Sequence, residues 1–189
     1  QWLIPHFEKM LYDNALLARV YLRTWQLTGD SVFRAVAVDV LDYLDGAMAD
    51  DLGAIHSAED ADSEGVEGKF AVWTWDELGA VLGADREIAA AIYGTTPEGN
   101  FEGANNLHRF HDLAGVAEHF DLSLEELTER RATIDRRLRA VRATRVPPER
   151  DDKIVAAWNG LAMRTFAEAG AVLEEGRYLE RARSIARFL

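Results

Sequence analysis

The sequence predicts an all-α protein assembled from helical hairpins, with a small β-hairpin inserted near residues 55–73. Apolar residues recur at helical spacing over most of the 189 residues. Two capping boxes, Thr74–Glu77 and Ser123–Glu126, mark the starts of two helices. Two stretches that lie 145 residues apart align with one another without a gap, which indicates a repeated helical unit.

The first helical hairpin is predicted over residues 8–50. Residues 8–28 carry apolar side chains on most sides, which is typical of a helix buried between layers. Gly29-Asp30 interrupts this pattern, and residues 31–50 place their apolar side chains on one face. We therefore expect the two segments to form an antiparallel pair of helices.

Residues 51–111 change character and are predicted to form an insertion of loops and short elements. Glycine and acidic residues dominate its first part, and we expect short strands at Ile55–Ser57 and Lys69–Trp73 around an acidic loop. A short helix follows the capping box at Thr74. Another covers residues 85–93, before a Gly- and Asn-rich loop completes the insertion.

Helical patterns return in the rest of the chain, where the expected helices cover 112–120, about 124–144, a stretch that ends near 173, and 177–189. Pro147-Pro148 ends the long charged helix, because a residue that precedes proline disfavours the helical conformation. We expect Asp151 or Asp152 to cap the helix that follows.

The internal repeat relates Tyr12–Leu44 to Ala157–Leu189. Its identical pairs are Asn14/Asn159, Leu16/Leu161, Arg19/Arg164, Ala37/Ala182 and Leu44/Leu189. The repeat predicts related hairpins near 8–50 and 151–189, as in solenoids or helical toroids. The alternative is that any two amphipathic hairpins align this well. Both ends of the chain fall inside structural patterns, so we expect residues 1–189 to be part of one larger domain.

Composition excludes several classes of function. The chain holds 21 Lys and Arg against 33 Asp and Glu, and this net charge of −12 argues against nucleic-acid binding. No apolar run of about 18 residues exists, so no membrane span is predicted and we expect a cytoplasmic protein. The absence of cysteine excludes disulfides, thiolate metal sites and a cysteine nucleophile within these residues.

Weaker motifs do not change this picture. The loop Asp60–Gly65 resembles the start of a calcium-binding loop, but its twelfth position is Ala71 instead of Glu. His108, His111 and His119 lack thiols or a carboxylate at metalloprotease spacing, so no metal or cofactor is predicted. The arginines of 129–145 are predicted to form a solvated face, with anion binding as a minor alternative.

Acidic residues near helix starts and loops are the candidates for catalysis. A histidine and carboxylates at the ends of inner helices can do general acid–base work, and adjacent carboxylates raise one another's pKa. The candidate catalytic residues are His6, Glu8, Asp60, Asp62, Glu64 and Asp152. The alternative is that these side chains cap helices or lie in a solvated turn.

Aromatic and amide side chains are the candidates for ligand binding. Carboxylates accept hydrogen bonds from sugar hydroxyls, and a flat aromatic ring packs against the C–H side of a sugar. The candidate binding residues are Asn14, Trp73, Trp75, Asn100, Trp158 and Asn159. The alternative for the two helical asparagines is an interhelical hydrogen bond, which a buried amide needs, and for the tryptophans a place in the core.

Several strings together resemble one family. They are Trp2–Asn14, Asp60–Gly65 with Glu67–Phe70, Thr96–Gly103, and Asp151–Ile154 with Trp158–Gly160. They resemble large proteins with an N-terminal thioredoxin-like domain, the family of spermatogenesis-associated protein and its bacterial YyaL-type relatives. The resemblance implies an (α/α)6 toroid similar to six-hairpin glycosidases and N-acylglucosamine 2-epimerase. It implies that this chain is an incomplete part of that toroid, with the thioredoxin-like domain upstream.

Two functions remain open at this stage, because the sequence motifs of the epimerases do not match here and a fold does not fix a function. The first is a carbohydrate site in the toroid cavity, acting as a sugar epimerase or isomerase, or as a glycoside hydrolase. Hydrolysis needs two carboxylates about 5–10 Å apart, whereas epimerisation needs a base such as His6. The second is a non-catalytic helical scaffold attached to the thioredoxin-like domain.

Overall fold

The structure is a computed structural model that describes residues 4–108 and 112–189. It is mostly helical with small β elements, so the all-α class with a β-hairpin is confirmed. The chain divides into two compact units. We call them the hairpin unit, Glu8–Ala61 with Pro148–Leu189, and the insert unit, which comprises Asp62–Pro147 and the residues up to Phe7. Among the described residues, no helix has the length and apolar character needed to cross a membrane.

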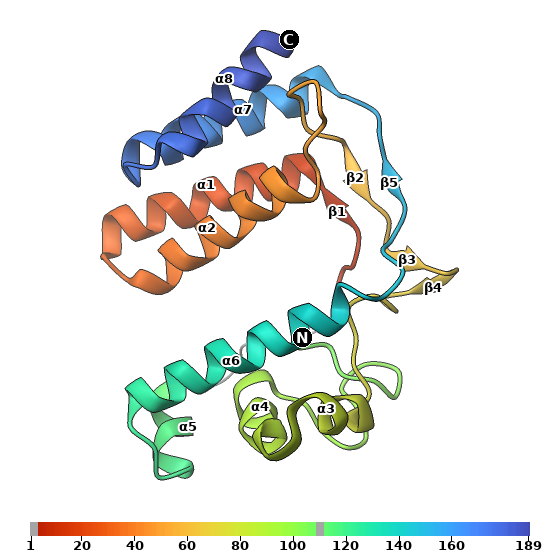
Figure 1. The fold of residues 1–189 in the computed structure, drawn as a ribbon. Helices are drawn as coiled ribbons and strands as arrows, with labels where there is room; N and C mark the ends of the chain where they lie inside the picture. The colour runs from red at the N-terminus through yellow and green to blue at the C-terminus, as the bar shows by residue number, and fades with distance from the viewer. Residues whose placement is uncertain (1–3, 109–111) are drawn as a thin grey trace. The chain divides into compact units, whose positions relative to one another are not determined.

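The hairpin unit is built from two pairs of helices (Figure 1). They are α1 (Leu11–Thr28) with α2 (Ser31–Gly46), and α7 (Ala156–Val172) with α8 (Gly176–Phe188). Gly29 ends α1 in the left-handed conformation, at φ 72°, and Asp30 caps α2 by accepting a hydrogen bond from the Val32 N–H. These two hairpins occupy the stretches that the 145-residue repeat relates.

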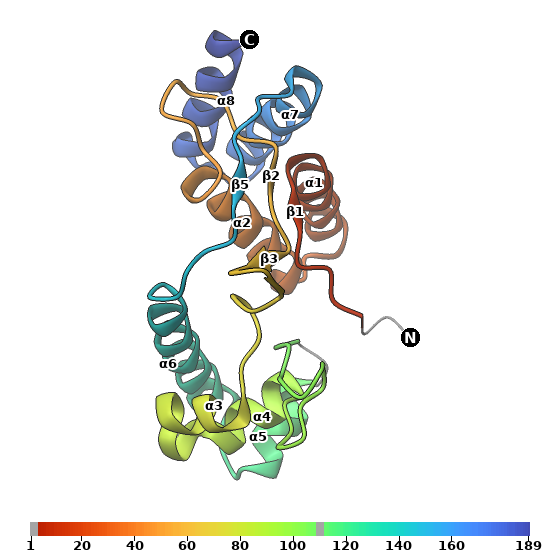
Figure 2. The same cartoon turned by 90° about the vertical axis from the view of Figure 1, so that its right-hand side faces the viewer.

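The core of this unit lies between the four helices. Helix α1 packs against both α2 and α7, and α7 packs against α8. Figure 2 shows α1 and α7 close to end-on. The fully buried side chains at the centre include Leu11, Leu22, Leu41, Phe166 and Tyr178. At the surface, Arg177 of α8 pairs with Asp42 of α2 at 2.6 Å, which ties the second helices of the two hairpins together.

A small antiparallel sheet stands where the chain enters α1 and α7. Its strands are β1 (Lys9–Met10), β2 (Ala58–Glu59) and β5 (Arg150–Asp151), in the order β1-β2-β5. Lys9 lies opposite Glu59, and Glu59 opposite Arg150. Because β1 leads directly into α1, the pairing fixes the start of that helix at Leu11 and corrects the expected start at residue 8.

The insert unit has its own core and its own hairpin. Its elements are β3 (Asp62–Ser63), β4 (Val66–Glu67), α3 (Trp75–Leu82), the 3-10 turn η1 (Gly83–Asp85), α4 (Arg86–Tyr93), α5 (Leu113–His119) and α6 (Leu124–Arg142). Leu78, Ile92, Leu127 and Ile134 are buried together with Trp73. Both predicted capping boxes are present, at the starts of α3 and α6.

Two further local predictions are wrong. The strands expected at Ile55–Ser57 and Lys69–Trp73 are not formed: Ile55 and Trp73 make only isolated bridges, to Ala49 and Asn105, and the hairpin lies at 62–67 instead. Neither aspartate caps α7, whose N-cap is Val155 without a side-chain cap. Instead, the Asp151 carboxylate forms an ion pair with Lys153, and the Asp152 carboxylate forms one with Arg150.

Candidate functional site

The candidate site is a pocket of about 290 Å³ in the hairpin unit, beside the three-stranded sheet. Its lining residues are Glu8, Met10, Ser57, Ala58, Asp60, Glu149, Arg150, Asp151 and Trp158. The pocket is acidic, because four of these side chains are carboxylates and one is a guanidinium.

The strand register explains why the acids gather. Met10, Ala58 and Asp151 lie opposite one another across the sheet. Extending this register by two residues places Glu8 opposite Asp60 and Asp60 opposite Glu149. The Asp60 N–H donates to the Glu149 carbonyl at 2.8 Å, which supports the second pair. Side chains two residues apart share one face of a strand, so the three acids form a row beside Asp151. Residues directly opposite in such a pair have Cβ atoms about 4.5–5.5 Å apart.

An aromatic ring forms another wall of the pocket. Trp158 stands in the first turn of α7 and is half-buried. Its ring lies against Tyr12 of α1, with the ring centroids 4.9 Å apart and the planes inclined at 58°. This contact orients the indole beside the carboxylates, because aromatic pairs prefer inclined or offset arrangements at this separation.

Asp151 and Asp152 are held in the charged form. The pKa of Asp151 is lowered chiefly by the hydrogen bond from Lys153, whose Nζ lies 3.0 Å from Oδ2. The pKa of Asp152 is lowered chiefly by Arg150, whose Nε donates to Oδ1 at 2.6 Å, and further by His56. Both carboxylates therefore act as acceptors at neutral pH and not as proton donors.

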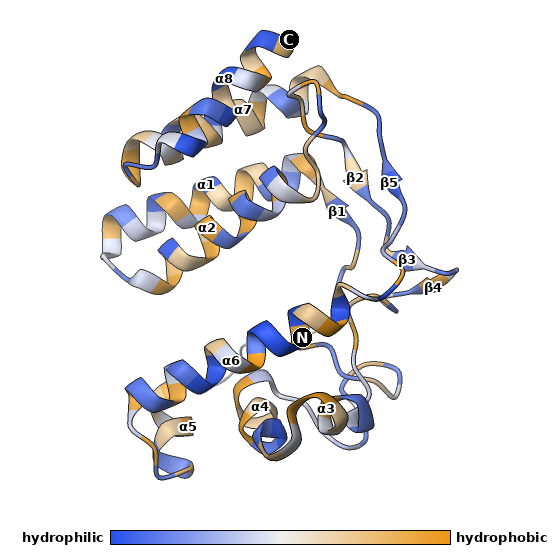
Figure 3. Cartoon of the chain, viewed as in Figure 1, coloured by the Kyte–Doolittle hydropathy of each residue, from blue (hydrophilic) through white to orange (hydrophobic). Residues whose placement is uncertain are grey.

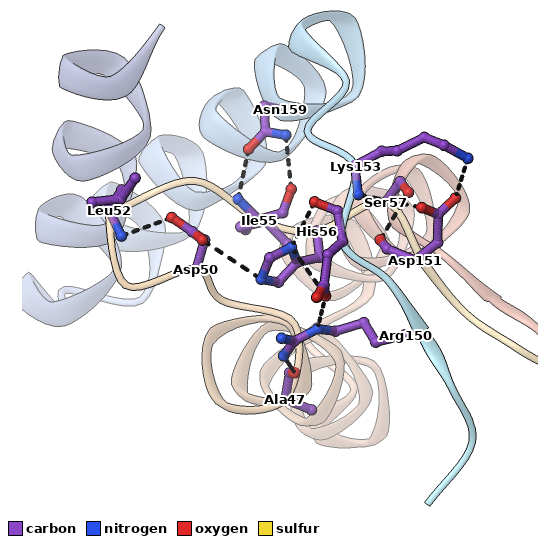
Figure 4. A network of polar contacts seen from close by, with 11 residues as sticks. Ala47, Asp50, Leu52, Ile55, His56, Ser57, Arg150, Asp151, Lys153 and Asn159 are labelled. Atoms are coloured by element: carbon purple, nitrogen blue, oxygen red, sulfur yellow. Dashed lines mark hydrogen bonds and ion pairs between the residues drawn. The ribbon is translucent and has the colours of Figure 1, made fainter.

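A polar network around His56 supports this end of the unit (Figure 4). The imidazole is buried between two carboxylates, with Nε2 3.7 Å from Asp50 Oδ2 and Nδ1 3.5 Å from Asp152 Oδ1. The guanidinium of Arg150 also donates to the Ala47 carbonyl at 3.2 Å. These contacts join the loop after α2 to the segment that leads from β5 into α7. Sequence reasoning missed His56, although a histidine in the otherwise small and apolar run Ala54–Ala58 was a signal.

The three asparagines that were candidates for binding have backbone partners. The side-chain amide of Asn159 forms hydrogen bonds with both the backbone N–H and the backbone carbonyl of Ile55. The Asn14 Nδ2 donates to the Met10 carbonyl at 2.8 Å. The Asn100 Nδ2 donates to the carbonyls of Gly94 and Asn106, and its Oδ1 accepts from the Asn106 N–H. The bonds of Asn14 and Asn159 are structural but not interhelical, because Met10 immediately precedes α1 and Ile55 lies in the loop before β2. Ligand binding by these amides stays a prediction.

The remaining candidates belong to the insert unit. His6 is exposed, and Glu64 pairs with Lys69 at 2.8 Å. Asp62 forms part of β3. Trp73 is buried beneath the guanidinium of Arg145, and Trp75 lies beneath that of Arg86. The hairpin unit thus brings Glu8, Asp60 and Trp158 to one pocket, with Asp152 ion-paired to the pocket residue Arg150.

Glu64 lines a pocket of about 480 Å³ in the insert unit. The charged side chains along this pocket have protein partners, since Lys69 pairs with Glu64 and Arg145 with Glu77. Over residues 4–108 and 112–189, no three His, Cys, Asp or Glu side chains are grouped so that they could hold a metal ion. His111, one of the three histidines considered above, lies outside the described residues.

The fold and the site together define a protein of repeated helical hairpins. Its acid-lined pocket lies beside the sheet from which the chain enters α1 and α7. Over its whole length the chain is similar to spermatogenesis-associated protein 20, with 35% identity to the human protein over 215 aligned positions and 34% to the mouse protein. It is 30% identical to an uncharacterised protein of Caenorhabditis elegans over 216 positions. The whole chain therefore aligns with one part of spermatogenesis-associated protein 20.

The chain spans only part of these relatives, 27% of the human protein and 29% of the nematode protein. No family model matches the chain.

Proposed function

We propose that the acidic pocket of the hairpin unit binds a carbohydrate. The observation that carries the proposal is the Trp158 ring standing beside Glu8 and Asp60 on one side of the sheet. An aromatic face can pack against the C–H side of a sugar ring, while carboxylates accept hydrogen bonds from its hydroxyls. A volume of about 290 Å³ lies at the lower end of the range of small-molecule sites, which favours one or two sugar rings.

The same side chains suit acid–base chemistry on that sugar. Glycoside hydrolysis uses two carboxyl groups on either side of the scissile bond, about 5–10 Å apart. Glu8 and Asp60 are the proposed pair, because the extended register sets them on neighbouring strands. No histidine lines this pocket within the described residues, so the arrangement favours hydrolysis over epimerisation through an imidazole base.

We further propose that the two hairpins are consecutive parts of an (α/α)6 toroid, with the pocket at the end of its inner helices. The repeat and the packing of α1 against α7 support this arrangement. In the longer protein, a thioredoxin-like domain upstream and a cytoplasmic location belong to the same proposal.

A second candidate function is a non-catalytic scaffold. It is favoured by the backbone bonds of Asn14, Asn100 and Asn159, since these place three residues of the family strings in structural roles. In that case the hairpins would present the thioredoxin-like domain to partner proteins, and the pocket would stay empty.

The experiment is a ligand screen on the full-length protein that contains these residues. Monosaccharides and disaccharides, including N-acetylated sugars, are added and the melting temperature is recorded, because a ligand that binds only the folded state raises it. We expect a sugar-specific rise that is lost in Glu8→Gln and Trp158→Ala. The rise should persist in the control Glu67→Gln, an exposed carboxylate of β4. The absence of any shift over the panel would favour the scaffold.

A further inference from the structure

Helix α1 exposes an apolar stripe to solvent. Leu16, Leu17, Val20 and Leu27 are between 44% and 87% exposed. Leu17, Val20 and Leu27 lie one, four and eleven residues after Leu16, which places all four on one side of the helix. Figure 3 shows apolar residues recurring along α1. Single exposed apolar residues are common, but a patch of neighbours such as Leu16, Leu17 and Val20 marks an interaction surface. Arg23 and Thr24 separate this patch from Leu27.

The repeat shows how such a face is used. The equivalents of the stripe, 145 residues later on α7, are Leu161, Ala162, Thr165 and Val172. On α7 this face is covered: Ala162 and Thr165 are buried, and the Thr165 hydroxyl donates to the Ala15 carbonyl of α1 at 3.0 Å. Leu161 and Val172 pack against the same core. We call this side of either helix its docking side.

Helix α1 receives α7 on a different side. Tyr12 stacks on Trp158, Ala15 accepts from Thr165, and Arg19 pairs with Glu168 at 2.8 Å. We call the side formed by Tyr12, Ala15 and Arg19 the receiving side of α1. Its equivalents on α7 are Ala157, Gly160 and Arg164, which are not fully buried. Each helix thus has one docking side and one receiving side. The interface formed within the hairpin unit is the one between the docking side of α7 and the receiving side of α1.

We propose that the docking side of α1 packs on the receiving side of another helix, in the geometry that α7 adopts on α1. The occupant is a helix from a segment of the longer protein outside residues 1–189. The lengths of the relatives leave room for it, since this chain spans 27% of the human protein. The interface continues the one already seen between α1 and α7.

Charge distinguishes this occupant from a second copy of the chain. Arg19, Arg23 and Arg164 share the single carboxylate of Glu168, so the group keeps a net positive charge. Arg23 is the repeat equivalent of Glu168, and Arg164 is the equivalent of Arg19. A second copy docked by this geometry would therefore bring Arg164 against Arg23, and like charges oppose such a contact. The proposed helix carries an acidic residue at the position of Arg19.

A photo-crosslinking experiment on the full-length protein tests the proposal. A benzophenone amino acid replaces Val20, with the same replacement at Val32 as the control, because Val32 is similarly exposed at the start of α2. We expect a crosslink within one molecule, from position 20 to a peptide outside residues 1–189. A crosslink to residues 62–147, a crosslink between two molecules, or a yield no higher than at Val32 would overturn the proposal.

A stability measurement gives a second readout. Val20→Asp is expected to lower the melting temperature of the full-length protein, because a charge would enter a buried interface. Val32→Asp should change it much less. Equal melting temperatures for the two variants would contradict the docking helix. Neither measurement needs a sugar, so this proposal can fail while carbohydrate binding succeeds, and the reverse.

Discussion

The side-chain amide of Asn159 pairs with both backbone groups of Ile55. Its Oδ1 accepts from the Ile55 N–H at 2.8 Å, and its Nδ2 donates to the Ile55 carbonyl at 2.9 Å. Both residues are fully buried. The amide therefore replaces a neighbouring strand for this stretch and holds the loop before β2 against the first turn of α7.

Replacing Asn159 by Ala should strongly destabilise the protein. Two buried backbone groups would lose their partner, and each such loss costs about 1–3 kcal/mol. Asn14, the repeat equivalent of Asn159, is the matched control, because its amide makes one bond to the Met10 carbonyl and is only half-buried. Urea unfolding of the full-length protein should show a loss at least twice as large for Asn159→Ala as for Asn14→Ala. Equal losses would contradict the role assigned to Asn159.

The sequence predicts those parts of the fold that are decided within a few residues. The capping boxes at Thr74 and Ser123 and the break at Gly29 depend on side chains and backbone groups within one turn, so their outcome is local. The strands at Lys9-Met10 and Arg150-Asp151 were not predicted, because each consists of two residues whose partners are distant in the chain. No periodicity can appear in so short a segment.

The same limit applies to the candidate site. Glu8 and Asp60 were chosen for their chemistry, but it is the strand register that brings them to one pocket. Asp62 has the same chemistry and lies two residues after Asp60, yet it belongs to the insert unit. Residue type alone could not separate these two aspartates. Similarly, the buried position of His56 depends on Asp50 and Asp152, which come from different segments.

Gly170 should not tolerate a side chain. A Cβ at this position would lie 2.5 Å from the Cγ of Leu179 and 2.9 Å from its backbone nitrogen, where α7 approaches α8. Gly170→Ala is therefore expected to cost about 1–3 kcal/mol of unfolding free energy, as overpacking usually does. Gly115→Ala in α5 is the control, since a Cβ there meets open space and alanine favours the helix by up to about 1 kcal/mol. Chemical denaturation should move the two midpoints in opposite directions.

Ser123→Ala should weaken the start of α6. The Ser123 hydroxyl accepts from the Glu126 N–H at 3.1 Å, and the Glu126 carboxylate accepts from the Ser123 N–H at 2.8 Å. The loss of such a cap costs about 1 kcal/mol. Hydrogen bonds from the Ser123 N–H and, second, from its hydroxyl lower the pKa of Glu126. The variant loses only the hydroxyl bond, so that pKa should rise by part of the shift while the backbone bond keeps the rest. Thr128→Ala, which removes only a bond to the Leu124 carbonyl, should change stability little. NMR titration and thermal unfolding would measure the two effects.

The ion pairs of Glu168 predict a loss of stability in acid. The hydrogen bond from Arg19, with help from Arg164 and Arg23, lowers the pKa of Glu168 to about 2 in the folded protein. The ordinary pKa is 4.5, so the unfolded state takes up this proton first, and the contribution is complete above pH 4.5 and lost as the pH falls toward 2. We expect about 1–2 kcal/mol, because water partly screens this group. Urea midpoints at pH 6, 4 and 3 should therefore fall less steeply in Glu168→Gln than in the wild type. Parallel curves for the two proteins would show that the carboxylate is not bound to the arginines in solution.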